Sequence, residues 1–138
     1  MNELTAADLR VALLRLARRV RAEKADSELT DTQFSLLAAL DRRGRATLKA
    51  LAEFERVQPP SMTKTVAHLV DRGLVTRSRD PDDGRQAFVE LTAAGHAAVD
   101  ETRRRRDAWL GMRLAALDDR ERAVLADATE IMRRIATE

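Results

Sequence analysis

Side chains that could hold a nucleic acid are concentrated between residues 47 and 85. Hydroxyl, ammonium and guanidinium groups donate hydrogen bonds to phosphate oxygens and to acceptor atoms on base edges. Hydroxyl and ammonium side chains follow Pro59 at short spacing, at positions 61, 63, 64 and 65. Further along, Arg85 ends the acidic turn of residues 80–84. The candidate binding residues read from the sequence are Thr47, Lys49, Pro60, Ser61, Thr63, Lys64, Thr65, His68, Arg77 and Arg85.

Residues suited to catalysis are few. His68 and His96 fall in predicted helices without a carboxylate or nucleophile pattern beside them, and Ser61 lacks the glycine-flanked setting of a nucleophile elbow. The absence of cysteine excludes disulfides, thiolate metal ligands and cysteine redox chemistry. The sequence has neither a metal-ligand cluster nor a phosphate-binding glycine loop. We therefore predict a protein that is not an enzyme and uses no metal or cofactor.

Length and composition indicate one domain built mainly of helices. The 138 residues are 44% hydrophobic but only 3% aromatic, so Leu, Val, Ile and Ala must form the core. The N-terminus lacks an apolar signal segment, and no run approaches the ~18–20 apolar residues of a membrane helix. A cytoplasmic protein without membrane contact is expected. The net charge is only +2, so the distribution of charge matters more than its sum.

Periodicity and capping residues predict the elements. Apolar residues at helical spacing alternate with Thr caps and Gly or Pro stops. The predicted helices are 4–24, 31–44, a short one after Thr47, 59–73, 92–117 and one after Asp118, and the predicted strands are 45–47, 75–78 and 87–91.

The two central helices and the hairpin that follows them form a recognisable pattern. In the helix from Pro59, the apolar residues Met62, Val66, Leu69 and Val70 share one side, and the other side is small, polar and partly basic. A helix pair with such a second helix, which we term the reading helix, predicts a helix-turn-helix. The hairpin adds a wing, so the predicted fold is mainly α with a small β-hairpin: a winged helix-turn-helix.

Each candidate binding residue has a simpler alternative role. The reading helix could place its first residues at base edges in the major groove, or its outer face could merely be solvated. Arg85 at the hairpin tip could enter the minor groove, where the potential is most negative, or belong to an ordinary acidic loop. Thr47 and Lys49 begin a helix whose free amides suit phosphate, but Thr47 could be a cap alone. Arg77 and Arg79 could contact the DNA backbone or be surface charges.

Apolar residues at both ends of the chain exceed what the central unit can cover. The helix from Thr92 spans roughly 26 residues and about 39 Å, longer than the core of so small a domain. A second copy of the chain would bury this surface. The predicted dimer interface comprises Leu4, Val11, Leu14, Leu117, Leu125, Ile131 and Ile135. Trp109 and Met112 could line an effector pocket or pack at the interface, and Arg103–Arg106 is predicted to be a solvated collar.

The run from residue 69 to 95 resembles the signature of the MarR family of winged-helix transcription regulators. The pieces that carry the resemblance are RGLV (72–75), Arg77, DPDDGR (80–85) and V-x-L-T-x-x-G (89–95). The resemblance implies a homodimer with interlocked terminal helices, bound to a roughly palindromic operator and often released by a small phenolic ligand. It also implies that Asp83 braces Arg85, which adds Asp83 to the DNA-binding residues. Lys64 stands where the family often has arginine, and lysine lacks the two-pronged geometry that suits guanine.

These observations predict a single MarR-like domain over residues 1–138. The DNA-binding unit is expected over about 30–92, and the helical dimerisation region over about 1–29 and 93–138. The predicted function is a sequence-specific, double-stranded DNA-binding transcriptional regulator, a repressor acting as a homodimer on an inverted repeat, with a possible small aromatic effector. The alternatives are a winged-helix protein-interaction module and a small-molecule-binding protein without DNA function.

Overall fold

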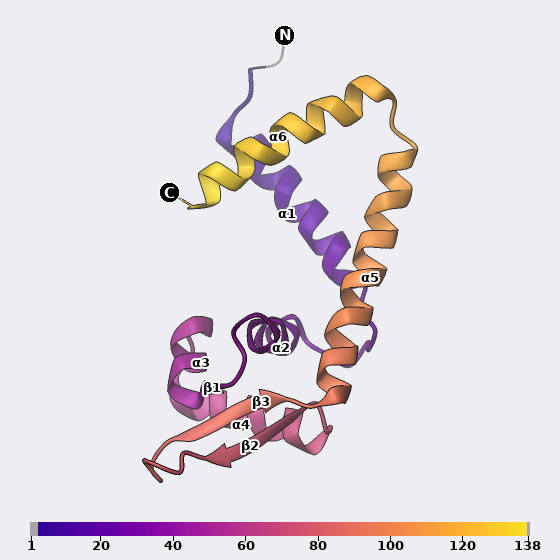
Figure 1. Cartoon of the computed structure of the whole chain (residues 1–138). Helices are drawn as coiled ribbons and strands as arrows, with labels where there is room; N and C mark the ends of the chain where they lie inside the picture. Colours follow the sequence, from indigo (N-terminus) through magenta and orange to yellow (C-terminus); the bar gives the residue numbers. More distant parts are fainter. Residues whose placement is uncertain (1–2, 138) are drawn as a thin grey trace.

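The computed structural model describes residues 3–137 and contains the predicted elements in the predicted order (Figure 1). Each predicted boundary agrees with the structure to within about two residues, apart from expected fraying at helix ends. The elements are α1 (Ala6–Ala22), α2 (Asp31–Arg43), β1 (Ala46–Thr47), α3 (Leu48–Glu55), α4 (Pro59–Asp71), β2 (Val75–Arg79), β3 (Ala87–Leu91), α5 (Ala93–Ala115) and α6 (Asp119–Thr137).

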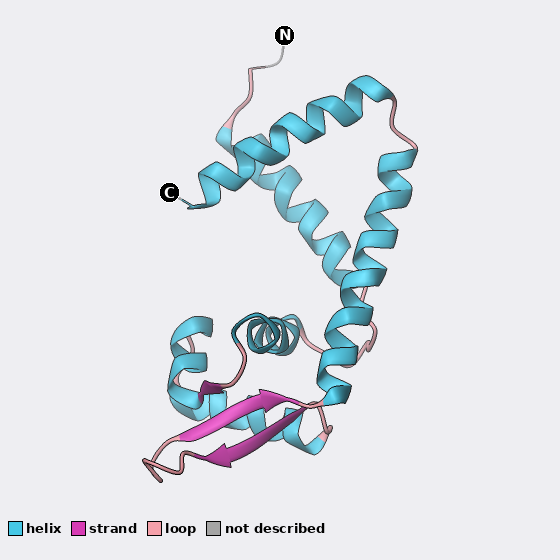
Figure 2. Ribbon diagram, in the orientation of Figure 1, coloured by secondary structure: helices cyan, strands magenta, loops and turns pink. Residues whose placement is uncertain are grey.

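The elements form two regions joined by one long helix (Figure 2). Helices α2, α3 and α4 pack with the small sheet at one end of the molecule, and α5 leads away from the end of β3. Helix α6 turns back from the far end of α5 and crosses α1, so both chain ends lie away from the sheet (Figure 1). The predicted fold class, mainly α with a small β wing, is confirmed.

Threonine residues start four of the helices. The side chains of Thr5, Thr30, Thr47 and Thr92 each accept a hydrogen bond from the amide three residues later. Each bond satisfies one amide that the first helical turn leaves free. At Thr30 the Gln33 side chain also bonds back to the cap, completing a capping box. These local contacts explain why the helix starts could be predicted from sequence.

The sheet has the strand order β1-β3-β2 and is antiparallel throughout. Val89 in the central strand pairs with Ala46 on one side and with Arg77 on the other. Val89 is fully buried, whereas Arg77 is exposed. Directly paired residues share one face of a sheet, so the contrast shows that the core covers the central strand β3 but ends before Arg77 on the edge strand β2.

The core lies between the helix-turn-helix and the sheet. Met62, Val66 and Leu69 of α4 are at most 1% exposed and belong to a buried cluster with α2, α3, β3 and the start of α5. Val70, which shares the apolar side of the helix, is 37% exposed. It lies about 100° around the helix from Leu69, beyond the strip that the core covers.

Two glycines shape the joints around the hairpin. Gly73 has a φ of +74° and ends α4 in the left-handed region that favours glycine. Gly95 in the first turn of α5 packs so closely on the carbonyl of Leu74 that a Cβ would collide with it. Thr92 completes the joint: its hydroxyl donates to the Gly73 carbonyl at 2.6 Å, and its amide donates to the Leu74 carbonyl at 3.1 Å. The threonine and glycine of the V-x-L-T-x-x-G motif thus fasten α5 to the end of α4.

The outer helices have no comparable core. Neither α1 nor α6 contains a buried residue in this single chain, and their large apolar side chains are widely exposed. Leu4 is 73% exposed and Ile135 is 60% exposed. None of the helices in the described range is both long and apolar enough to cross a membrane.

Candidate nucleic-acid interface

The reading helix α4 presents side chains, rather than amides, at its first turn. Pro59 and Pro60 have no amide hydrogen, and the Met62 amide already donates to the Gln58 carbonyl at 3.2 Å. Ser61 and Lys64 are exposed on this turn. Contacts made by this end of α4 must therefore come mainly from the Ser61 hydroxyl and the Lys64 ammonium.

Two threonines of α4 use their hydroxyl hydrogens inside the helix. Thr63 donates to the carbonyl of Pro59, and Thr65 donates to the carbonyl of Ser61, each at 3.0 Å. Such back-bonding leaves the hydroxyl oxygens as acceptors only. The expectation that both threonines act as donors is therefore wrong for this conformation. Ser61 and Lys64 are the donors that remain, and exposed His68 lies about one turn beyond Lys64.

The wing turn is held by aspartate side chains bonded to the main chain. Asp80 Oδ1 accepts from the Asp82 amide at 2.9 Å, and Asp83 Oδ1 accepts from the Arg85 amide at 3.1 Å. Two main-chain bonds involving Gln86 close the loop. Asp83 thus braces Arg85 through its backbone, and within residues 3–137 no ion pair links the two side chains. The guanidinium of Arg85 remains exposed.

One groove brings five of the predicted binding residues together from separate elements. It lies between the start of α3, the start of α4 and the wing, with a volume of about 320 Å³. Its predicted members are Thr47, Lys49, Thr63, Arg77 and Arg85. A second hollow of about 480 Å³ on the wing shares Arg77 and Arg85 and adds Arg79. The tertiary fold thus assembles one basic surface from segments far apart in the sequence.

Gln86 is a candidate that sequence reasoning missed. It lines both hollows and immediately follows Arg85. Its amide side chain carries both donors and an acceptor, which suits sugar, phosphate or base-edge contacts. Its position beside the tip arginine was the available signal, but a lone glutamine at the foot of a predicted strand carries little weight.

Other residues of the described range 3–137 do not neutralise the cations of this surface. In the part of the chain that the structure describes, Lys49, Lys64, Arg77 and Arg85 take part in no ion pair. Exposed, unpaired cations around a groove attract anions such as the phosphates of a duplex. By contrast, two of the three wing-turn carboxylates are engaged by backbone amides.

Comparison with known proteins identifies the family of this fold. The sequence profile of the MarR family matches residues 29–87. An HTH-type transcriptional regulator of Mycobacterium bovis, Mb0904, is 41% identical over 96% of this chain and 93% of its own length. The chain belongs to the MarR family.

Solved structures of MarR-type regulators agree with this fold along almost the whole chain. A transcriptional regulator of Pseudomonas aeruginosa superposes with a TM-score of 0.86 at 32% identity, over 96% of this chain and 94% of the other. The PcaV regulator of Streptomyces coelicolor, solved with its natural ligand, superposes with a TM-score of 0.65 at 25% identity, over 99% and 98% of the two chains. MarR regulators bind DNA and act as dimers. The chain is therefore a DNA-binding transcriptional regulator and not an enzyme.

The predicted MarR dimer residues divide into three groups. Leu4, Leu125, Ile131 and Ile135 converge on an apolar groove of about 330 Å³ between α1 and α6. Val11 and Leu14 lie elsewhere on α1 and are 38% and 51% exposed. Leu117 lies at the turn from α5 to α6 and is half-buried. All seven are at least partly open in one chain.

The two predicted effector residues differ in setting. Met112 is 73% exposed. Two guanidinium groups lie over the Trp109 ring, that of Arg113 at 3.8 Å and that of Arg19 at 4.9 Å from the ring centre. Such cation–π stacking supports a packing role where α5 crosses α1. A ligand-binding role for Trp109 and Met112 stays a prediction.

The arginine run on α5 is a solvated collar only in part. Arg103 pairs with Asp41 of α2 at 2.6 Å, and Arg106 stacks on Phe34 of α2 with 4.3 Å between the guanidinium carbon and the ring centre. Burial lowers the pKa of Arg106 below its usual value. Arg105 and Arg106 also donate to main-chain carbonyls just after α1. The solvated-collar prediction holds for Arg104, whose side chain is 78% exposed, and was wrong for Arg103 and Arg106, which lie against α2.

Proposed function

We propose that a homodimer of this chain binds an inverted-repeat operator, with α4 in the major groove and the wing in the adjacent minor groove. The single observation that carries this proposal is the basic groove shared by α3, α4 and the wing. The groove is lined by the starts of α3 and α4 and by the wing, and a reading helix and a wing contact a duplex backbone at neighbouring positions. Bound in this way over a promoter, the dimer would act as a repressor.

We assign the contacts according to the chemistry of each side chain. Ser61 and Lys64 would reach base edges, Arg85 would enter the minor groove, and Asp83 would hold the wing turn that presents it. The helix start at Thr47 and Lys49 would receive a phosphate. The full set of proposed contact residues is Thr47, Lys49, Pro60, Ser61, Thr63, Lys64, Thr65, His68, Arg77, Asp83 and Arg85.

The terminal helices are the proposed dimer contact. Their exposed apolar side chains around the α1–α6 groove would be buried by a second copy, at about 25 cal/mol for each Å² removed from water. On this view, the DNA-binding unit comprises about residues 30–92, and the dimerisation region comprises about residues 1–29 and 93–138. A protein that acts on bacterial promoters would work in the cytoplasm.

We further propose that a small aromatic effector releases the operator. Support comes from PcaV, a relative whose structure holds its natural ligand. A ligand between the dimerisation helices and the DNA-binding unit, near Trp109 and Met112, would change the spacing of the two reading helices.

Selection of bound duplexes from a random pool tests the proposal, with sedimentation measured on the same protein. We expect an inverted repeat whose half-sites lie about one duplex turn, or 34 Å, apart. Affinity should fall steeply as salt rises. A monomer at micromolar concentration, or no duplex binding in dilute buffer, would contradict it. A protein-interaction module or a ligand-sequestering protein would also give no salt-dependent binding to duplex.

A further inference from the structure

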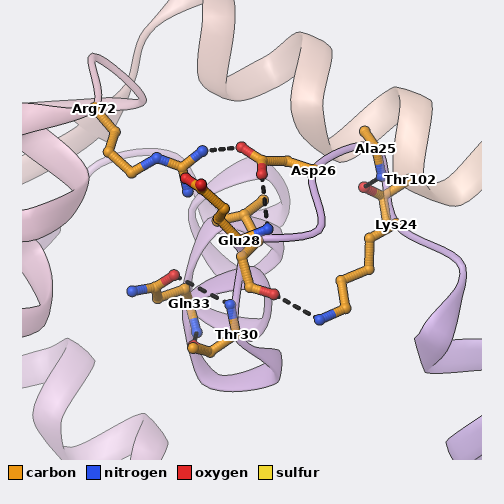
Figure 3. Close-up of polar contacts among 9 residues, drawn as sticks. Lys24, Ala25, Asp26, Glu28, Thr30, Gln33, Arg72 and Thr102 are labelled. Atoms are coloured by element: carbon orange, nitrogen blue, oxygen red, sulfur yellow. Dashed lines mark hydrogen bonds and ion pairs between the residues drawn. The ribbon is translucent and has the colours of Figure 1, made fainter.

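Residues 23–30, which we term the connector, join α1 to α2 and are bonded to α5 and to the end of α4 (Figure 3). Connectors on protein surfaces are usually free to move. This one is bonded on two sides by side chains from distant positions in the sequence, and its last residues are anchored in the core. The connector is therefore held by more contacts than the joining of two helices requires.

One side of the connector is fastened to α5. The hydroxyl of Thr102, which is fully buried, accepts from the Ala25 amide at 3.1 Å. Arg105 donates to the Lys24 carbonyl at 2.9 Å, and Arg106 donates to the Glu23 carbonyl at 3.1 Å. These three bonds fix the connector backbone to the helix that leads to the dimerisation region.

The other side of the connector is fastened to the end of the reading helix. The Asp26 carboxylate pairs with Nη2 of Arg72, the residue that caps the C-terminus of α4 (Figure 3). The side chains are only 32% and 22% exposed, so solvent screens this pair less than a surface pair. Asp26 is itself oriented by the Glu28 amide, which donates to Oδ1 at 2.9 Å.

The end of the connector is anchored in the core. Leu29 is 1% exposed, and Lys24 reaches across to donate to its carbonyl at 2.7 Å. Thr30 then caps α2. The connector thus has fixed contacts with α5 on one side and, through Asp26, with the end of α4 on the other.

From this juxtaposition we propose that Asp26 and Arg72 are positioning residues that set the orientation of α4 relative to α5, and thereby the half-site spacing that the dimer accepts. The inference rests on the proposed operator binding. Helix α4 has 13 residues, about 20 Å, so its DNA-facing start lies at the far end from Arg72. A small rotation at Arg72 therefore becomes a displacement of a few ångströms where Ser61 would meet bases.

The pair is suited to such adjustment because it is a single contact. Nη1 of Arg72 is buried without a hydrogen-bond partner among the described residues, so the guanidinium does not form the two-pronged contact typical of rigid arginine–carboxylate pairs. Loss of this one bond removes the link between the connector and α4, whereas the joint of Thr92 with the Gly73 and Leu74 carbonyls remains. The core of α4, formed by Met62, Val66 and Leu69, does not depend on that bond.

The test uses Asp26→Asn and Arg72→Gln in the full chain, with Asp119→Asn as the matched control. Asp119 pairs with Arg122 inside α6 and links no separate elements. Affinity is measured on duplexes that carry the selected half-sites at spacings altered in single base-pair steps, with the melting temperature recorded in parallel. We expect the wild-type preference for one spacing to weaken on the order of tenfold in either variant, and the double variant to lose no more.

A second measurement needs no DNA. Because the chain has no cysteine, Ala67→Cys on the exposed face of α4 allows one spin label for each copy. In the dimer, Asp26→Asn and Arg72→Gln should each broaden the distance distribution between the two labels, and Asp119→Asn should not.

The outcomes separate the two proposals. Wild-type spacing preference and an unchanged label distance in both variants, with only a lower melting temperature, would show a purely structural pair and overturn the inference alone. A wild-type protein that binds no duplex would overturn the proposed operator binding. The label distance would then still decide whether the pair orients α4.

Discussion

Asp83 Oδ1 accepts a hydrogen bond from the main-chain amide of Arg85 at 3.1 Å, and this bond leaves the Arg85 side chain free. The carboxylate thus shapes the turn instead of neutralising the cation that the turn presents. An asparagine could accept the same bond through its side-chain oxygen.

Asp83→Asn should therefore retain DNA binding, with a small gain in affinity because one negative charge near the phosphates is removed. Asp83→Ala should weaken binding because the turn loses its brace. Fluorescence anisotropy with the selected duplex measures both. Equal losses in the two variants would show that the charge of Asp83, and not its hydrogen bond, supports Arg85.

Arg85→Ala should lower operator affinity and reduce the slope of log affinity against log salt by about one contact. The reason is the loss of an unpaired guanidinium at the edge of the basic groove. The measurement is a titration at four salt concentrations, with Arg120→Ala of α6 as a control that removes the same charge far from the wing. An unchanged slope in Arg85→Ala would exclude the wing-tip contact.

Gly95→Ala should destabilise the fold by about 1–3 kcal/mol, because the added methyl group would collide with the Leu74 carbonyl. Gly111 lies in the same helix with open space around it. Gly111→Ala should instead stabilise the protein by about 0.5–1 kcal/mol through a better helix propensity. Urea unfolding of the two variants checks the contrast. Similar gains in stability in the Gly95→Ala and Gly111→Ala variants would refute the close packing of α5 on the hairpin joint.

Asp41→Asn should reduce the dependence of stability on acid pH. Hydrogen bonds from Arg103 and then from His96 hold the pKa of Asp41 below its ordinary value of 3.8. A carboxyl with a lowered pKa in the folded state contributes stability above its unfolded pKa and loses it as pH falls through the folded pKa. The variant should be less stable than wild type at pH 6 and similar to it well below pH 3.8. Chemical unfolding of both proteins across this pH range measures their free energies of unfolding. The same pH dependence in the variant and in wild type would contradict the prediction.

Ile131→Asp should weaken the dimer on the order of tenfold or more, because a charge would enter the apolar groove between α1 and α6. Analytical ultracentrifugation over a range of concentrations measures the dissociation constant. Glu130→Gln, which changes an exposed neighbour, should leave it unchanged. If Ile131→Asp dimerised as tightly as wild type, the interface would have to lie elsewhere.

The sequence alone determined the elements and the family. Helix starts at Thr30, Thr47 and Thr92 depend on hydrogen bonds that span three residues, and the wing turn depends on residues 80–85, so both are visible in local spacing. The buried stripe of Met62, Val66 and Leu69 follows in the same way from helical periodicity.

Only the tertiary structure decided which charges meet. Asp26 and Arg72 are 46 residues apart, and Arg103 is 62 residues from Asp41, so neither pair leaves a trace in local spacing. The same is true of the groove that places Thr47 beside Arg85. The physical reason is that a charged side chain satisfies local sequence rules equally well in water or in a pair. Its partner is chosen only when packing of the core brings distant elements together.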